Sequence, residues 1–278
     1  MSFVVAVVIG LLAGTHTATW GMFKDSPHEG FTYRRYSRSI FVSTISAPLL
    51  AWVAGLNPLT ASGIVLLFGA TYVTERGVVE FYKTFVRDED QSKYTIPMQF
   101  HVFGKVIRDR WTRSLIAAAH VVVIGAATAL LYEQRWLEAR LSPVAMILIG
   151  GSIGGWISAF GGGFKDAPIE GFHTFKFFRS PVFAAAYALL LSAFTDNLLL
   201  MAMGGLGYTV ATIETYKTFF FPSKPRGKFA DKPITHPENL ALRKRFVPIY
   251  FGIWLFVIVS FAMAFQAKAE AARQMSSL

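Results

Sequence analysis

Side chains that can bind ions gather in a nine-residue stretch that the chain contains twice. Phe23-Lys-Asp-Ser-Pro-His-Glu-Gly-Phe31 returns as Phe164-Lys-Asp-Ala-Pro-Ile-Glu-Gly-Phe172, with seven of nine positions identical. The lysine can attract an anion such as phosphate, and the two carboxylates can bind a cation or orient the lysine. Proline and glycine favour a turn, followed here by a short amphipathic helix over residues 31–38. A fold-defining turn and a charged binding site are therefore the two interpretations.

A second pattern follows in each half of the chain. It reads Glu80-x-Tyr82-Lys83-Thr84-Phe85 and Glu214-x-Tyr216-Lys217-Thr218-Phe219. A lysine three residues after a glutamate lies about one helical turn away, so an ion pair is expected in each copy. Either these are interfacial ion pairs, or the lysines of both patterns surround an anionic ligand. The predicted ligand-binding residues are Lys24, Asp25, Glu29, Glu80, Lys83, Lys165, Asp166, Glu170, Glu214 and Lys217.

Basic residues recur at matching positions in two long polar segments. Their histidines and arginines either anchor the protein at the membrane surface or clamp a lipid headgroup through bidentate phosphate contacts. The predicted headgroup contacts are His101, Arg108, Arg110, His236, Arg243 and Arg245.

Two histidines lie inside apolar stretches and break the repeat. His16 aligns with Ile157, and His120 aligns with Leu255. Such a histidine forms an interhelical hydrogen bond, or belongs to a proton relay or a pigment or metal site. Neither has the partner four residues away that a helical metal pair needs, so metal and cofactor both stay unassigned.

Helices that cross a membrane must position these residues. The 278-residue chain is 53% hydrophobic and only 16% charged, and its mean hydropathy is +0.43. Helices satisfy their own backbone hydrogen bonds in lipid, and about 20 apolar residues cross the hydrocarbon core. We therefore predict an all-α polytopic membrane protein with spans near 2–22, 39–56, 58–81, 114–132, 143–163, 180–199, 201–221 and 246–267.

The two patterns predict a tandem duplication. Residues 1–140 and 141–278 would each form a four-helix membrane repeat. An even number of spans gives both repeats the same orientation, related by a pseudo-two-fold axis along the membrane normal. Of 27 lysines and arginines, 23 fall on the side that carries both patterns. The positive-inside rule makes that side cytoplasmic and places both termini on the opposite side.

Composition also limits the function. No cysteine is present, which excludes disulfides, thiolate metal sites and a cysteine nucleophile. The net charge is +10, and the charged residues lie in segments between the apolar spans. This pattern is typical of attraction to anionic lipid headgroups. No nucleic-acid motif accompanies it.

Doubled charges favour a transporter or channel for an anionic solute or lipid phosphate, with membrane lipids as partners. One alternative is a non-catalytic subunit whose protein partners form a larger membrane complex. The other is an enzyme acting on a lipid phosphate headgroup, with a metal held by Asp25 and Asp166. An enzyme is less favoured, because the chain contains no Walker loop, GxSxG or HExxH motif.

Overall fold

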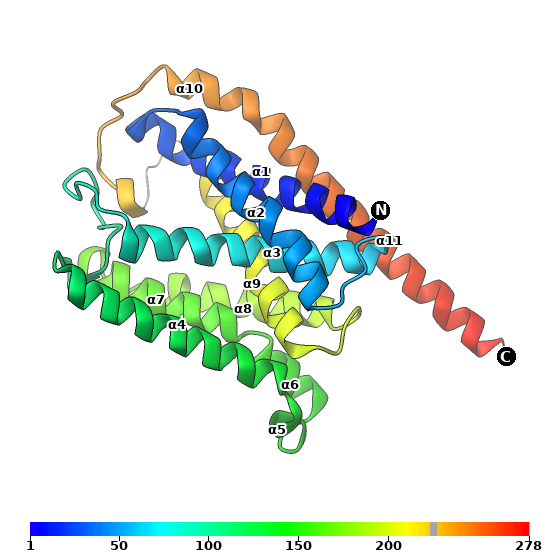
Figure 1. The fold of residues 1–278 in the computed structure, drawn as a ribbon. Coiled ribbons are helices and arrows are strands. Elements are labelled where there is room, and N and C mark those ends of the chain that lie inside the picture. Colours follow the sequence, from blue (N-terminus) through cyan, green and yellow to red (C-terminus); the bar gives the residue numbers. More distant parts are fainter. Residues whose placement is uncertain (223–226, 278) are drawn as a thin grey trace.

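The computed structural model describes residues 1–222 and 227–277 of an almost entirely helical protein (Figure 1). The first half contains α1 (Ser2–Glu29), α2 (Tyr33–Val53), α3 (Ala61–Phe81), the π-helical turn η1 (Tyr82–Val86), the strands β1 (His101–Val102) and β2 (Lys105–Val106), and α4 (Arg110–Tyr132). The second half contains α5 (Arg135–Glu138), α6 (Pro143–Gly150), α7 (Ile153–Glu170), α8 (Thr174–Leu191), α9 (Leu198–Thr215), the π-helical turn η2 (Tyr216–Phe220), η3 (Gly227–Phe229), α10 (Asn239–Leu242), η4 (Arg243–Phe246) and α11 (Val247–Ser276). The predicted all-α class is confirmed.

Helices occupy all eight stretches expected to span a membrane, but they are not equally apolar. Within the described residues, five helical segments are long and apolar enough to cross a membrane: Ser2–Glu29, Arg110–Tyr132, Pro143–Glu170, Leu198–Phe220 and Asn239–Ser276. The helices α2, α3 and α8 fall outside this set, because polar and charged residues lower their mean hydropathy.

The turn after α1 differs from the sequence prediction. Helix α1 continues through Pro27 to Glu29, and Gly30 then adopts φ 76°, a conformation that favours glycine. The side chain of Thr32 accepts a hydrogen bond from the backbone of Arg35 and caps α2. A separate amphipathic helix over residues 31–38 was therefore a wrong prediction, because residues 33–38 form the first turns of α2. Gly171 reverses the chain after α7 with φ 83°.

Glycines set the distances between the helices. A Cβ atom on Gly10 or Gly14 would lie 2.5 Å from the backbone of α2, and one on Gly207 of α9 would lie 2.1 Å from the carbonyl oxygen of Gly69 on α3. Such small residues let helix backbones approach closely. The crossing of α3 and α9 joins the two halves of the chain.

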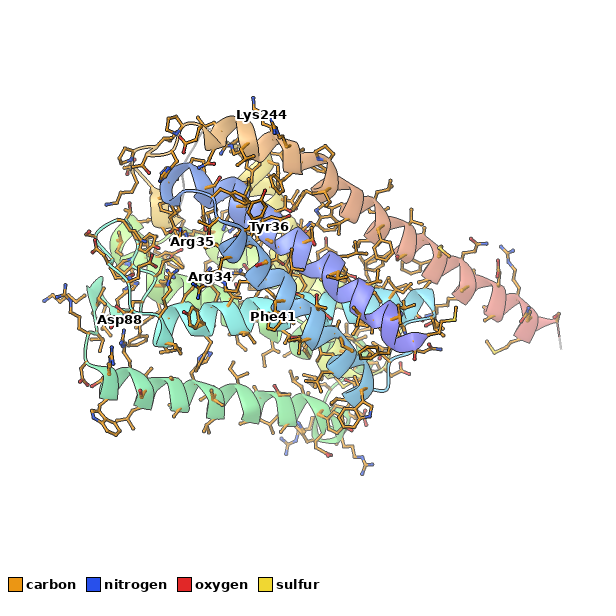
Figure 2. The ribbon with its side chains drawn as sticks, turned by 45° about the horizontal axis from the view of Figure 1, so that its top comes forward. Arg34, Arg35, Tyr36, Phe41, Asp88 and Lys244 are labelled. Atoms are coloured by element: carbon orange, nitrogen blue, oxygen red, sulfur yellow. The ribbon has the colours of Figure 1, made fainter. Side chains whose placement is uncertain are left out.

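The ends of the bundle differ in character. In Figure 1, the long loops before α4 and before α10 lie at the left, whereas the N-terminus and the end of α11 lie at the right. In Figure 2, Arg34 and Arg35 lie at the start of α2, Lys244 lies at the top in η4, just before α11, and Asp88 lies at the left in the loop before α4. We call this left end, with its two loops, the charged end.

Candidate functional site

The repeated charged patterns meet at the charged end, where an ion pair connects the halves. Lys24 on α1 lies with its Nζ atom 3.8 Å from Oε2 of Glu214 on α9. Beside this pair, the rings of Phe23 and Phe219 lie 4.6 Å apart between centroids. Lys24 of the nine-residue pattern in the first half thus meets Glu214 of the second pattern in the other half.

Both expected glutamate–lysine ion pairs are present. Lys83 Nζ lies 3.1 Å from Glu80, and Lys217 Nζ lies 3.3 Å from Glu214. Both pairs lie where an α-helix widens into a π-helical turn, at α3–η1 and α9–η2. Arg76 also donates a hydrogen bond to Glu80. These glutamates therefore already have partners in the protein.

The carboxylates that follow Lys24 bind the second half of the chain. Lys228 lies 2.8 Å from Asp25 and 3.3 Å from Glu29. The hydroxyl of Tyr94, from the loop before α4, donates a 2.7 Å hydrogen bond to Glu29. Burial, together with the charge of Glu29, raises the pKa of Tyr94, so the hydroxyl keeps its proton. The first copy of the nine-residue pattern is thus an anchor for both long loops.

The second copy is arranged differently. Lys176 of α8 bridges Asp166 and Glu170, at 2.8 Å from each. The Nζ atom of Lys165 lies 4.0 Å from the sulfur of Met98, which belongs to the loop before α4. Of the four predicted lysines, Lys24 and Lys217 line the cavity described next, and Lys83 and Lys165 do not.

A cavity of about 1120 Å³ opens at the charged end between the two copies. Among the residues that the structure describes, its charged lining contains six basic residues and two carboxylates, namely Lys24, Lys176, Arg179, Lys217, Arg243 and Lys244 with Asp166 and Glu170. Apolar side chains such as Phe23, Phe175 and Phe221 complete the wall. Thr218 is only 5% exposed, and its hydroxyl in this wall has no hydrogen-bond partner among residues 1–222 and 227–277. The cavity is therefore basic, partly apolar and able to donate hydrogen bonds.

The predicted headgroup residues are distributed unevenly. Arg108, Arg110 and Arg245 are exposed, whereas Arg243 donates a 3.1 Å hydrogen bond to the carbonyl of Phe23 and lines the cavity. The side chain of His236 lies against Gly30.

His101 is buried, which removes it from any headgroup at the surface in this arrangement. Only 3% of the residue is exposed, and neither ring nitrogen has a hydrogen-bond partner among the described residues. Burial, with the nearby charge of Lys165, lowers the pKa of His101 despite the opposing effect of Asp166.

The two histidines within helices have separate environments. His16 shares a 3.1 Å hydrogen bond with the hydroxyl of Tyr72 on α3, and its ring stacks on Tyr250 of α11 at 4.0 Å. The predicted interhelical hydrogen bond of His16 is thereby confirmed. His120 is exposed on α4, with its ring 5.7 Å from that of Phe85.

Several charged residues of this region escaped the sequence prediction. Lys176 occupies the position that matches Arg35, and Lys228 matches Lys93, so a search for basic residues shared by both halves would have found them. Arg76 matches Val210, so the repeat carried no signal for it.

Within the described part of the chain, no three His, Asp or Glu side chains lie together as a metal site would require. The chain matches no protein-family model, no curated protein and no solved structure with which it was compared.

Proposed function

We propose that this chain is an integral membrane transporter for an anionic amphiphile that carries a phosphate group. The cavity at the charged end would be its cytoplasmic vestibule. The observation that carries the proposal is the lining of this cavity, where six basic residues face two carboxylates beside a wall of aromatic rings. Basic groups attract phosphate, and aromatic rings suit the apolar part of an amphiphile at a membrane interface.

The proposed architecture is two tandem four-helix repeats with eight spans and both termini outside. Matched local structures support it. Gly30 and Gly171, at corresponding positions, reverse the chain with φ 76° and 83°, and both Tyr-Lys-Thr-Phe segments form π-helical turns. Corresponding glycines also pack closely in both halves, as Gly14 does on α2 and Gly155 does on α8.

The first test is mass spectrometry of molecules that co-purify with the full chain. We expect a phosphate-bearing compound with the wild type and its loss in the Lys24→Ala, Lys217→Ala double variant. Lys268→Ala is the control, because Lys268 binds the carbonyl of Ala193 outside the cavity. A compound that persists in the double variant would contradict the proposed site.

The transport step is tested in proteoliposomes. Efflux of inorganic phosphate and movement of fluorescent phosphatidic acid between leaflets are measured for the same variants. We expect wild-type flux of one probe and at least about tenfold slower flux in the double variant, since two charges that attract the anion are missing.

A non-catalytic subunit of a larger membrane complex is the second candidate. The close contact between Gly207 and Gly69 favours it, because it leaves little room for a path between the halves. Helix α4 also presents large apolar residues such as Val122 and Leu115, which are more than two-thirds exposed. Binding of a phosphate compound without flux of either probe would favour this candidate.

A further inference from the structure

Two small recesses adjoin the charged end, one in each half. The first-half recess has a volume of about 90 Å³ and is lined by residues that include Gly21, Met22 and Arg76. The second-half recess has a volume of about 150 Å³ and is lined at the matching positions by Gly162, Gly163 and Val210. Met22 and Arg76 of the first recess are thus replaced in the second by the smaller Gly163 and Val210.

The two recesses carry the same charge. Three basic side chains and two carboxylates line each, namely Arg35, Arg76, Lys83, Asp25 and Glu29 in the first half and Lys176, Arg179, Lys217, Asp166 and Glu214 in the second. The two recesses therefore do not differ in formal charge, but they do differ in volume. A cavity of about 150 Å³ can hold a molecule the size of benzene. The second recess is therefore large enough for a phosphate group.

The second recess also connects chemically to the large cavity. Its residues Asp166, Lys176 and Lys217 line both spaces. An ammonium group has three N–H donors; Lys217 uses one on Glu214, and Lys176 uses two, on Asp166 and Glu170. Donors are therefore left for an anion.

We infer that the second-half recess alone binds the phosphate group, so the duplicated chain holds one ligand, whose apolar part lies in the adjoining large cavity. This inference rests on the proposed function and specifies where the phosphate binds. In the first half, Arg76 and Met22 occupy the corresponding space, and the guanidinium of Arg76 lies 5.0 Å from the ring centre of Trp20.

Two equivalent glycines provide a matched test. Gly21 and Gly162 each line one recess, and a Cβ atom on either would meet no atom within 4 Å. Methionine at either position therefore adds a long side chain to the wall of one recess without a clash at its Cβ. Binding to the purified full chain in phosphate-free detergent is measured by calorimetry, with inorganic phosphate and dioctanoyl phosphatidic acid as the probes.

We expect Gly162→Met to weaken binding by at least about tenfold and Gly21→Met to change it by less than about twofold. Binding of inorganic phosphate would identify a free anion as sufficient, and binding of phosphatidic acid alone would identify a lipid headgroup. Thermal unfolding checks that both variants fold. If Gly162→Met does not fold, Gly163→Met replaces it, since its Cβ would contact only Phe177 at an ordinary 3.7 Å.

Equal weakening by both variants, or weakening by Gly21→Met alone, would overturn the inference. Normal binding by Gly162→Met would overturn it while leaving the proposed function intact. A wild-type protein that binds neither probe would overturn both.

Discussion

Lys228 holds together parts of the chain that are far apart in sequence. Its side chain is 10% exposed, and its ammonium group pairs with Asp25 and Glu29. We expect Lys228→Ala to lower the free energy of unfolding by about 2 kcal/mol, less than for a fully buried pair, because two carboxylates lose their partner. Thermal unfolding in detergent measures the change.

Lys93→Ala is the matched control, since Lys93 occupies the corresponding position but pairs with Glu89 nearer the surface. A loss of about 1 kcal/mol or less is expected there. Equal losses for the two variants would contradict the anchoring function of Lys228.

The buried carboxylate of Glu75 lowers the stability of this fold. It is fully buried on α3, neither carboxylate oxygen has a hydrogen bond of good geometry within the described part of the chain, and Arg76 approaches it only to 3.9 Å. Because burying a charge without hydrogen bonds is unfavourable, we expect Glu75→Gln to leave the melting temperature unchanged or to raise it. Glu80→Gln should lower it, since Glu80 binds both Arg76 and Lys83. The reverse order of the two melting temperatures would refute this explanation.

His101 predicts a pH dependence of stability. Burial and Lys165 lower its pKa in the folded protein, so the unfolded chain binds more protons at acidic pH. Its contribution to stability is therefore complete above about pH 6.5, the ordinary value, and is lost as the pH falls below it. We expect the fall in melting temperature between about pH 7.5 and 5.5 to be smaller in His101→Asn than in the wild type. Parallel curves for both proteins would exclude His101 as the cause.

At the scale of helices, the crossing of α3 and α9 leaves no space for a side chain. A Cβ atom on Gly207 would lie 2.1 Å from the carbonyl oxygen of Gly69. Gly207→Leu should therefore lower stability by about 3 kcal/mol or prevent folding, as overpacking does. Gly252→Ala on α11 is the control, because its Cβ would meet open space, and it should raise stability by up to about 1 kcal/mol through helix propensity. A folded Gly207→Leu protein of normal melting temperature would show that the helices separate easily.

At the scale of the whole molecule, the number of spans decides where the termini lie. Eight spans place both termini on one side of the membrane, whereas five would place them on opposite sides. The chain has no cysteine, so Ser2→Cys and Ser277→Cys each provide a single labelling site on an exposed residue. We expect a membrane-impermeant thiol reagent to label both from the same side of sealed vesicles. Labelling from opposite sides would refute the arrangement of two parallel repeats.

The sequence alone determined the features that depend on local composition. Apolar length predicted helices, since backbone groups in lipid must pair within their own segment, and Gly30 marked a turn that requires a positive φ. The pairs Glu80–Lys83 and Glu214–Lys217 were predictable, because helical geometry brings residues three apart together.

Tertiary structure decided which repeated charges face a shared space. Lys24 and Lys165 occupy the same position in the two copies of the nine-residue pattern. Lys24 nevertheless lines the cavity, whereas Lys165 contacts the sulfur of Met98. This difference arises because the surroundings of each copy come from distant segments, and residues such as Arg76 and Val210 fill matching positions with different volumes. Sequence periodicity records local geometry, whereas the volume left between helices depends on every side chain that packs there.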